Sequence, residues 1–289
     1  METQAQLGII GGSGLYAMEG LENVSEHKIS TPFGEPSSPI VIGTLGSLQV
    51  AFLARHGIGH FINPSEVNYR ANIYALKSLG VKWVVAVSAC GSLREDYAPG
   101  DIVVPDQLFD LTKDRKRSFF EGGLVAHISV AEPFCTDLCG LVQDAVAATE
   151  ATVHDGGTYI TVEGPRFSTR GESNVYRTWG MSIIGMTTSP EAFLAREAEM
   201  CYSVMAHVTD YDVWHVSEEP VTVEIVMRTV QQNTVVAKQA IQNLVNQLTP
   251  EVECQHQNAL AEALTTDASN VPPETLQKLT LFTDKYWGA

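Results

Sequence analysis

Two carboxylates, Asp210 and Asp212, stand two residues apart directly after the apolar stretch from Tyr202 to Val208. That stretch predicts a short buried strand, and in extended backbone both carboxylates would leave it on the same side. The loop at the carboxyl end of a buried strand is where open α/β sheets bind their ligands. A carboxylate pair there can hold a base-like ligand by its N–H groups or protonate it. An ordinary acidic loop with an Asx turn explains these residues equally well.

Arg55 and His56 form a second candidate group, directly after the predicted strand from Leu48 to Leu53. A guanidinium presents a fork of N–H donors that suits phosphate or carboxylate, and an imidazole can donate at or below neutral pH. The alternative is a surface turn. The pair is therefore a candidate anion site, and its neighbours in the fold decide whether it binds an anion.

Glycines and hydroxyls follow two further predicted strands. The loop Gly11–Gly14 follows Leu7–Ile10, and Ser88–Ser92 follows Trp83–Val87. Glycine loops let backbone N–H groups approach an anion, and hydroxyls add donors. The first loop lacks both the third glycine of a dinucleotide fingerprint and the Gly-Lys-Ser/Thr of a Walker loop. It is a plausible anion cradle, and a plain tight turn is the alternative.

Thr187 lies where the predicted strand Ile183–Met186 gives way to a helix. The segment Ser189–Glu191 has the N-cap, first-turn and dipole preferences of a helix start, and helix N-termini favour anions. Because several strands end in donors of this kind, we expect one rim of one sheet to form one site. Phe167, after the strand Thr158–Val162, offers a ring on which a planar base can stack, although such a ring is more often part of the core.

The elements that must position these residues alternate between strands and helices. Apolar spacing and end signals predict helices at Asn68–Leu79, Cys139–Ala148, Ala192–Met200 and Thr222–Leu248, and two short ones in the tail at Gln255–Leu264 and Pro272–Trp287. The polar segment Leu108–Phe120, with a basic run from Lys113 to Arg117, predicts a solvated loop. The alternation indicates an α/β protein.

Composition limits the function. The chain has 289 residues, of which 44% are apolar and 18% charged, and its formal net charge is −16. This length suits one large α/β domain or two smaller ones. The acidic balance argues against binding nucleic acid or an anionic membrane, where basic residues must dominate. Neither a signal peptide nor a membrane span is predicted.

Cysteine usage is typical of a reducing compartment. The five cysteines are Cys90, Cys135, Cys139, Cys201 and Cys254, an odd number in a large chain without a signal peptide. We therefore expect reduced thiols. Cys135 and Cys139 are separated by three residues, and we find no second Cys/His pair of zinc-site spacing beside them, so no metal site is predicted.

Several of these junctions together resemble the S-methyl-5′-thioadenosine phosphorylase family, within the trimeric purine nucleoside phosphorylase superfamily. The matching segments are Gly8–Leu15, Leu53–Gly57, Val67–Asn72, Ser88–Glu95, Ala131–Cys135, Glu163–Ser168, Met186–Thr188 and Thr209–Asp212. The resemblance implies a single-domain purine nucleoside phosphorylase-like α/β fold, with a mixed, partly barrel-like sheet flanked by helices. The match weakens after Pro250. We expect a catalytic domain over residues 1–250 and a helical tail over residues 251–289 that packs on the domain or on a neighbouring subunit.

The resemblance implies phosphorolysis, in which S-methyl-5′-thioadenosine and phosphate give adenine and 5-methylthioribose 1-phosphate. Inorganic phosphate is then a co-substrate, and neither a cofactor nor a metal is expected. The implied phosphate ligands are Ser13, Arg55, His56, Ser88 and Thr187. Ala89 and Met186 would line the ribose, and Phe167, Ser168, Asp210 and Asp212 the purine. Thr209, Val223, Val226 and, from a neighbouring subunit, His127 would face the methylthio group. Asp210, Asp212 and His56 are the expected catalytic residues.

Elementary chemistry supports these roles. Phosphorolysis passes through a sugar with oxocarbenium-like character, as glycoside hydrolysis does, and bound phosphate can stabilise that charge and then attack. The leaving purine needs a proton or hydrogen bond at N7. Asp210 can supply it if burial or Asp212 raises its pKa above the usual value of about 3.9. The 6-oxopurine phosphorylases carry Glu and Asn where this chain has Ser168 and Asp210, so an adenine-type substrate is predicted.

Two alternatives stay open. One is a phosphorylase of methylthioinosine or of other 6-oxopurine nucleosides, and the other is a nucleoside-binding protein that has lost turnover. A hydrolytic nucleosidase fits less well, because Arg55 and His56 with the hydroxyl set suit phosphate and not water. The resemblance also implies a homotrimer, with a dimer of trimers as the variant assembly, and the cysteine usage predicts a cytoplasmic protein.

Overall fold

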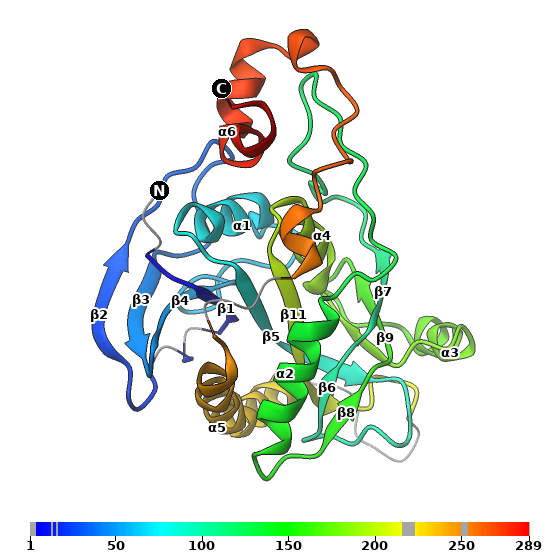
Figure 1. Ribbon diagram of the computed structural model, residues 1–289. Helices are drawn as coiled ribbons and strands as arrows, with labels where there is room; N and C mark the ends of the chain where they lie inside the picture. The colour runs from blue at the N-terminus through cyan, green and yellow to red at the C-terminus, as the bar shows by residue number, and fades with distance from the viewer. Residues whose placement is uncertain (1–3, 13, 16, 216–222, 250–253, 289) are drawn as a thin grey trace.

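One mixed sheet of eleven strands forms the centre of the computed structural model (Figure 1), which describes residues 4–12, 14–15, 17–215, 223–249 and 254–288. The strands are β1 (Leu7–Gly11), β2 (Glu22–His27), β3 (Ile40–Leu45), β4 (Leu48–Ala54), β5 (Trp83–Ser92), β6 (Ile102–Val104), β7 (Gln107–Leu111), β8 (Val153–Asp155), β9 (Thr158–Val162), β10 (Ile183–Gly185) and β11 (Cys201–Asp210). The helices are α1 (Tyr69–Ser78), α2 (Thr136–Ala147), α3 (Arg170–Thr178), α4 (Thr188–Glu197), α5 (Val223–Gln247) and α6 (Pro273–Trp287), with short 3-10 turns η1 (Gln255–Asn258) and η2 (Ala268–Asn270).

The sheet branches at β5. Its main path runs β2-β3-β4-β1-β5-β10-β9-β7, while β11 pairs with both β5 and β6, and β6 pairs with β8. Strands β1, β4, β5 and β11 are parallel, and β10 meets the last residues of β5 in antiparallel register. Along the described strands the sheet does not close into a barrel. The branch brings the carboxyl ends of several strands together.

Helices cover the central strands from two sides. Figure 1 shows α1 and α4 on one side of β5 and β11, and α2 and α5 on the other. The buried residues of α5 include Ala237, Ala240, Ile241 and Leu244, which recur at helical spacing and face the core. Strand β11 is buried along almost its whole length, as expected for a strand covered by helices on both faces.

Element prediction succeeds where periodicity or caps are strong. Helix α1 begins after the cap Asn68, whose side chain accepts from the backbone of Ala71, and α6 matches the prediction for Pro272–Trp287. Strand β2 was not predicted, because five of its six residues are exposed and it has no apolar alternation. Strand β7 was missed because most of it falls in the polar segment Leu108–Phe120 that was predicted as a loop, and helix α3 was missed although Thr169 and Glu172 form a capping box at its start.

The tail packs against the body of the chain. Phe282 of α6 contacts the rings of Tyr74 and Phe119, with centroids 5.6 and 4.6 Å apart. The buried carboxylate of Glu199, just before β11, accepts from the backbone N–H of Leu260 at 3.0 Å and from Lys285 at 3.1 Å. These contacts tie residues 254–288 to α1 and to the start of β11. No helix among the described residues is long and apolar enough to cross a membrane.

Candidate active site

The predicted site residues gather along one rim of the sheet. Arg55 follows β4, Ser88 and Ala89 lie in the last half of β5, and Asp210 ends β11. These three strands connect through β1 in parallel register, so their carboxyl ends share one edge. Thr187 joins them because β10 runs back along β5 in the opposite direction. The topology therefore explains how positions far apart in the sequence meet.

Arg55 is buried in a closed polar network. Its Nε and Nη2 donate to the two carboxylate oxygens of Glu191, at 2.7 and 2.8 Å, and the carboxylate is fully buried. Nη1 donates to the carbonyl of Val87 at 3.2 Å and Nη2 to that of Ile10 at 3.4 Å. Tyr202 donates its hydroxyl to Glu191 at 2.8 Å. Four of the five guanidinium N–H groups are thus engaged, so one N–H on Nη1 is left to reach an anion.

His56 has a fixed tautomer. Its Nδ1 lies 2.9 Å from the carbonyl oxygen of Ile62, and because a carbonyl can only accept, Nδ1 carries the proton. Burial, followed by the nearby charge of Arg55, lowers the pKa of His56 to about 4. The ring is therefore neutral at pH 7 in the ligand-free protein, and Nε2 is a bare acceptor. Nε2 can accept a hydrogen bond from a protonated ligand oxygen but cannot donate one.

Hydroxyl donors without protein partners stand beside this network. Ser88 Oγ is buried and has no hydrogen-bond partner among the described residues. Thr187 is the N-cap of α4, and its side chain makes no capping hydrogen bond. Ala89 is exposed although Ser88 and Cys90 on either side are buried, so one face of β5 is open at this point. Buried hydroxyls left unpaired at the mouth of an open strand face are ready to bind a polar ligand.

Asp210 and Asp212 approach each other at the end of β11. Asp210 Oδ1 accepts from the backbone N–H of Asp212 at 2.8 Å, and Oδ2 accepts from Thr209 Oγ1 at 2.6 Å. Asp212 has a φ of +49°, so the backbone is not extended there, and the Asx turn and the carboxylate pair occur together. Gly91 allows this approach, because a Cβ there would lie 3.0 Å from Asp210 Oδ1 and 3.3 Å from Asp212 Cβ.

Both carboxylates favour protonation. Burial is the main cause that raises the pKa of Asp210, and the hydrogen bond from Thr209 partly opposes it. Burial also raises the pKa of Asp212 to about 6, and the charge of Asp210 adds to the effect. Neither carboxylate has an ion-pair partner in the described part of the chain. The pair can therefore hold a proton near neutral pH.

The loop after β9 completes the rim. Gly164 has a φ of +70°, and a Cβ there would lie 2.6 Å from Met186 Sδ, so glycine lets this loop pack on Met186. Phe167 is 39% exposed on the same loop and Ser168 is half-buried. An exposed ring on this loop suits a ligand face more than a core position, which favours the binding interpretation of Phe167.

Comparison with known proteins decides the family. Residues 6–249 match the model of the phosphorylase superfamily. The S-methyl-5′-thioadenosine phosphorylase of Geobacter sulfurreducens is 50% identical over 281 residues, which cover 97% of this chain and 98% of the relative. That of Hyperthermus butylicus is 57% identical over 249 residues, 86% of this chain and 90% of the relative. The chain belongs to the S-methyl-5′-thioadenosine phosphorylase family of the phosphorylase superfamily.

Solved structures agree with this assignment. A methylthioadenosine phosphorylase from an Antarctic soil metagenomic library has a TM-score of 0.93 and 45% identity, covering 97% of this chain and 99% of that structure. The methylthioadenosine phosphorylase of Schistosoma mansoni in complex with adenine has a TM-score of 0.84 and 36% identity, covering 90% and 99%. The predicted family resemblance and fold class are confirmed.

Two positioning residues of this phosphorylase were not foreseen from the sequence. Arg115 lies in the basic run Lys113–Arg117 predicted to be solvated, yet it is buried. Its Nη1 donates to the carbonyls of Met186 and Ser189, both at 2.7 Å, and its Nη2 to that of Glu163 at 2.7 Å. It thus holds together the two loops that carry Phe167 and Thr187. Glu191 was interpreted only as a helix-dipole residue, and its ion pair with Arg55 had no local signal.

The predicted roles of four further positions are not tested by the described residues of one chain. Ser13 and the side chains of Val223 and Val226 lie outside the described residues, so their predicted roles stay predictions. His127 is exposed, and its backbone N–H donates to Ala263 in the tail at 2.9 Å. A role of His127 at the methylthio group stays a prediction that requires a second subunit.

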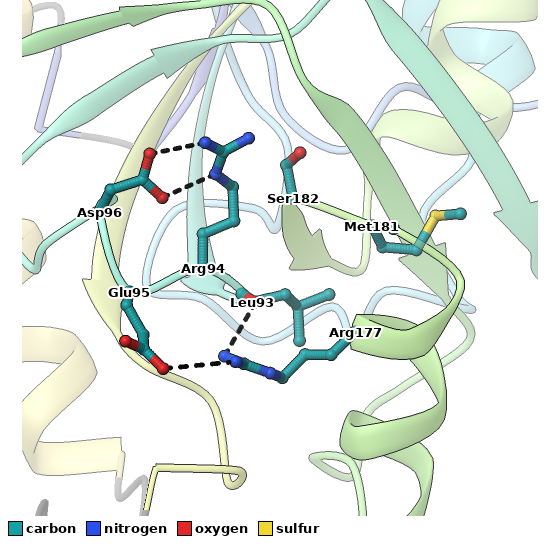
Figure 2. Close-up of a pocket in the computed structure, with 8 residues that line it drawn as sticks. Leu93, Arg94, Glu95, Asp96, Arg177, Met181 and Ser182 are labelled. Atoms are coloured by element: carbon teal, nitrogen blue, oxygen red, sulfur yellow. Dashed lines mark hydrogen bonds and ion pairs between the residues drawn. The ribbon is translucent and has the colours of Figure 1, made fainter.

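A surface depression beyond the end of β5 is separate from the rim. Figure 2 shows its lining, in which Arg94 pairs with Asp96 at 2.6 Å and Arg177 with Glu95 at 3.6 Å. Arg177 also donates to the carbonyl of Leu93 at 3.1 Å. None of the predicted site residues lines it. Its charged groups satisfy one another, so it offers no competing candidate site.

The cysteines differ from the prediction. The structure joins Cys201 and Cys254 in a disulfide, so the expectation of reduced thiols is wrong for this pair. Cys90, Cys135 and Cys139 are free and buried. Cys254 also lies two residues before His256, closer than the ligand spacing of the usual zinc motifs.

Proposed function

We propose that this chain cleaves S-methyl-5′-thioadenosine with inorganic phosphate, giving adenine and 5-methylthioribose 1-phosphate. The observation that carries the proposal is the buried pair Asp210 and Asp212, with raised pKa values, on the same rim as the unpaired hydroxyl of Ser88. One end of this rim suits a leaving purine that needs a proton, and the other suits an anion. The names of the relatives described above support the same substrate.

Phosphate binds at the end of the rim formed by Arg55, His56, Ser88 and Thr187. The hydroxyls of Ser88 and Thr187 donate to it, and Arg55 contributes its remaining N–H, since Glu191 occupies the fork. Ser189 interrupts α4 with extended backbone, so the regular helix begins at Pro190 and its N-terminus lies just beyond Thr187, where it adds a favourable potential for an anion. Nε2 of His56 accepts a hydrogen bond from the P–OH group of hydrogen phosphate, because Nδ1 is committed to the carbonyl of Ile62. Ser13 is proposed to complete this set.

The reaction breaks one bond to C1′ of the sugar, forms another, and transfers two protons. A phosphate oxygen bonds to C1′ of the sugar while the C1′–N9 bond breaks, and the bonding electrons of that bond stay with the purine. Asp210 gives its proton to N7, and the proton of hydrogen phosphate, held in a hydrogen bond to Nε2 of His56, leaves the new phosphate ester for solvent. Asp210 then regains a proton from solvent before the next turnover. A proton delivered at the leaving group is worth about 10²–10⁴-fold in rate.

The purine is selected by hydrogen bonding. Asp212 accepts from the 6-amino group of adenine, whereas a 6-carbonyl would face a carboxylate with no proton to offer. Phe167 stacks on the base, Ser168 lies at its edge, and Ala89 and Met186 line the ribose. Thr209, Val223 and Val226 face the methylthio group. A buried polar group left unpaired discriminates strongly against the wrong base.

We further propose a cytoplasmic homotrimer that needs no cofactor besides its co-substrate phosphate. His127 and the neighbouring Val125 are exposed on one segment, which suits a subunit contact in which His127 reaches the methylthio group next door. We also propose a division into a catalytic domain over 1–250 and a tail over 251–289, which the end of the superfamily model at residue 249 supports.

Release of free base tests the proposal. Methylthioadenosine, methylthioinosine, adenosine and inosine are each incubated with the protein, with and without phosphate. Phosphate-dependent release, fastest from methylthioadenosine, is expected. Cleavage without phosphate would assign a hydrolase and remove the role of His56, and preference for the inosine forms would overturn the roles of Asp210 and Asp212. No release from any of the four would support a binding protein.

The variant Asp210→Asn separates base choice from turnover. An amide cannot give up a proton as a carboxylic acid does, so release from methylthioadenosine should fall by about 10²-fold or more. The ratio of methylthioadenosine to methylthioinosine turnover should also fall, because an amide tolerates a 6-oxopurine. An unchanged ratio would show that Asp210 does not read the base. The control Asp96→Asn, in the separate depression, should leave both values unchanged.

A further inference from the structure

A second cluster of reactive side chains lies at the other end of β11 from the active site. Cys135, Cys201, Cys254 and His256 each point one sulfur or nitrogen atom at a common centre, and these atoms all lie within 4.8 Å of one another. All four residues are buried, with exposures between 0 and 6%. We call this set the Cys3His cluster. Nothing in the phosphorolysis described above uses it.

Three separate segments build the cluster. Cys135 is the N-cap of α2, and its backbone N–H donates to the carbonyl of Tyr202 at 2.9 Å, which places it beside Cys201. Cys254 caps the turn η1, where its Sγ accepts from the backbone N–H of His256 at 3.3 Å. Its Sγ is also 3.4 Å from that of Cys135. A backbone hydrogen bond therefore fixes Cys135 beside Cys201, and a single turn carries both Cys254 and His256.

The composition and spacing match a closed zinc site. Structural zinc sites are tetrahedral, with Cys3His among their usual ligand sets and Zn–S distances of about 2.3 Å, so two coordinating sulfur atoms lie about 3.8 Å apart. Atoms that are all within 4.8 Å of one another can reach such a centre with small side-chain rotations. A disulfide between Cys201 and Cys254 uses two of the four groups, and it leaves Cys135 and His256 unexplained. A metal uses all four.

We propose that the reduced Cys3His cluster binds one Zn²⁺ ion, through the thiolates of Cys135, Cys201 and Cys254 and one imidazole nitrogen of His256. The disulfide and the metal exclude each other. Two electrons from a thiol or phosphine reductant open the Cys201–Cys254 bond to two thiols. The three thiols of the cluster then release three protons to solvent as Zn²⁺ binds their sulfur atoms.

The ion would fasten the tail to the catalytic sheet. Cys254 and His256 begin the tail, Cys201 is the first residue of β11, and Asp210 is the last. A strand of this length places the cluster about 30 Å from Asp210, so no direct role in catalysis follows. The nearby contacts of Glu199 with Leu260 and Lys285 hold the same junction. The zinc is thus a structural link, and its loss should loosen residues 254–288 first.

Metal content is the first measurement. Full-length protein is expressed with zinc in the medium and purified in the presence of a phosphine reductant. Its metal content is then measured by inductively coupled plasma mass spectrometry. One zinc per chain is expected, and Co²⁺ in its place should give the intense visible bands of a tetrahedral thiolate site. The variants Cys135→Ser and His256→Asn should each retain less than about a tenth of the zinc. Cys139→Ser is the matched control, since Cys139 is buried on the same helix but contacts Ser203.

The outcomes decide between the two states of the sulfur atoms. Retention of zinc by wild type and Cys139→Ser, with loss in the two ligand variants, supports the proposal. Wild-type protein that holds no zinc and no cobalt after full reduction overturns it, whether or not the variants fold. So does a zinc content that Cys135→Ser leaves unchanged. Chelation should lower the Tm by about 5 °C or more while the release of adenine below that temperature stays the same. Failure of this test leaves the phosphorolysis intact.

Discussion

The two ends of the active-site rim are built on opposite principles. At the proposed phosphate end, formed by Arg55, His56, Ser88 and Thr187, Glu191 neutralises the buried cation Arg55. At the proposed purine end, formed by Phe167, Ser168, Asp210 and Asp212, two acids lie together with no ion-pair partner among the described residues, and burial raises both pKa values. Removing one partner of the first arrangement would leave a buried charge unpaired. The second arrangement disfavours the ionised carboxylates and is proposed to supply a proton, as catalytic sites often do.

The buried ion pair gives the largest expected effect. Glu191→Ala leaves Arg55 as an unpaired buried charge and removes the acceptor of the Tyr202 hydroxyl. Breaking such a pair from one side costs about 3–5 kcal/mol, so the free energy of unfolding in urea should fall by that amount. The control Glu95→Ala breaks a contact of 3.6 Å to Arg177, in which the Glu95 side chain is 78% exposed, and should cost under about 1 kcal/mol. Equal losses would contradict the contrast between paired burial and surface pairing.

This pair also shows where sequence reasoning stops. The rim itself was predictable, because each junction of strand and loop carries local signals: glycines, hydroxyls and a carboxylate pair at fixed positions. The partners of those residues were not, since Glu191 lies 136 positions from Arg55 and only the branched sheet brings them together. The same holds for Arg115, whose charged neighbours in the sequence are typical of a solvated loop. The Cys3His cluster likewise needs three segments that no local pattern connects.

Asp212→Asn tests how much folding stability the buried carboxylate at the proposed purine end costs. The pKa of Asp212 is raised in the folded state to about 6, from an ordinary value of 3.8, so between these pH values the folded state binds more protons than the unfolded state. Wild-type stability therefore falls as pH rises from about 4 to 6 and stays reduced above that, by up to about 3 kcal/mol. The amide avoids this loss. The free energy of unfolding in urea should therefore be measured at pH 4 and at pH 8 for both proteins. Relative to wild type, that of the variant should be about 1–3 kcal/mol more favourable to the folded state at pH 8 than at pH 4.

The matched control is Asp96→Asn, whose stability relative to wild type should change with pH in the opposite direction. The hydrogen bond from Arg94 lowers the pKa of the exposed Asp96, so Asp96→Asn should lose a little stability at pH 8 relative to pH 4 and gain none. An Asp212→Asn variant that behaves like this control would mean that the carboxylate is not penalised by burial. The proposed contrast between a neutralised phosphate end and a purine end that costs stability would then be wrong.

Ser88→Ala probes the unpaired hydroxyl of the phosphate end. Ser88 Oγ is buried without a described protein partner, so its removal should not lower the free energy of unfolding and can raise it slightly. A lost hydrogen bond to a charged ligand costs roughly 1.5 kcal/mol, so the KM for phosphate should rise about tenfold with the nucleoside KM unchanged. The control Ser78→Ala removes a hydroxyl bonded to Ala75 in α1 and should leave both KM values alone. A loss of stability without a change in phosphate KM would make Ser88 structural.

Phe167→Ala should give the smallest effect and belongs to the purine end alone. Stacking of an aromatic ring is worth about 0.5–1.5 kcal/mol, so the KM for methylthioadenosine should rise about 2- to 10-fold while the phosphate KM stays constant. Phe109→Ala is a matched control, since Phe109 is also 39% exposed but packs near Trp179, with centroids 5.9 Å apart. If both variants change the nucleoside KM equally, the exposed ring of Phe167 is not a base platform. If Phe167→Ala changes the phosphate KM instead, the two ends are coupled through the loop that Arg115 holds.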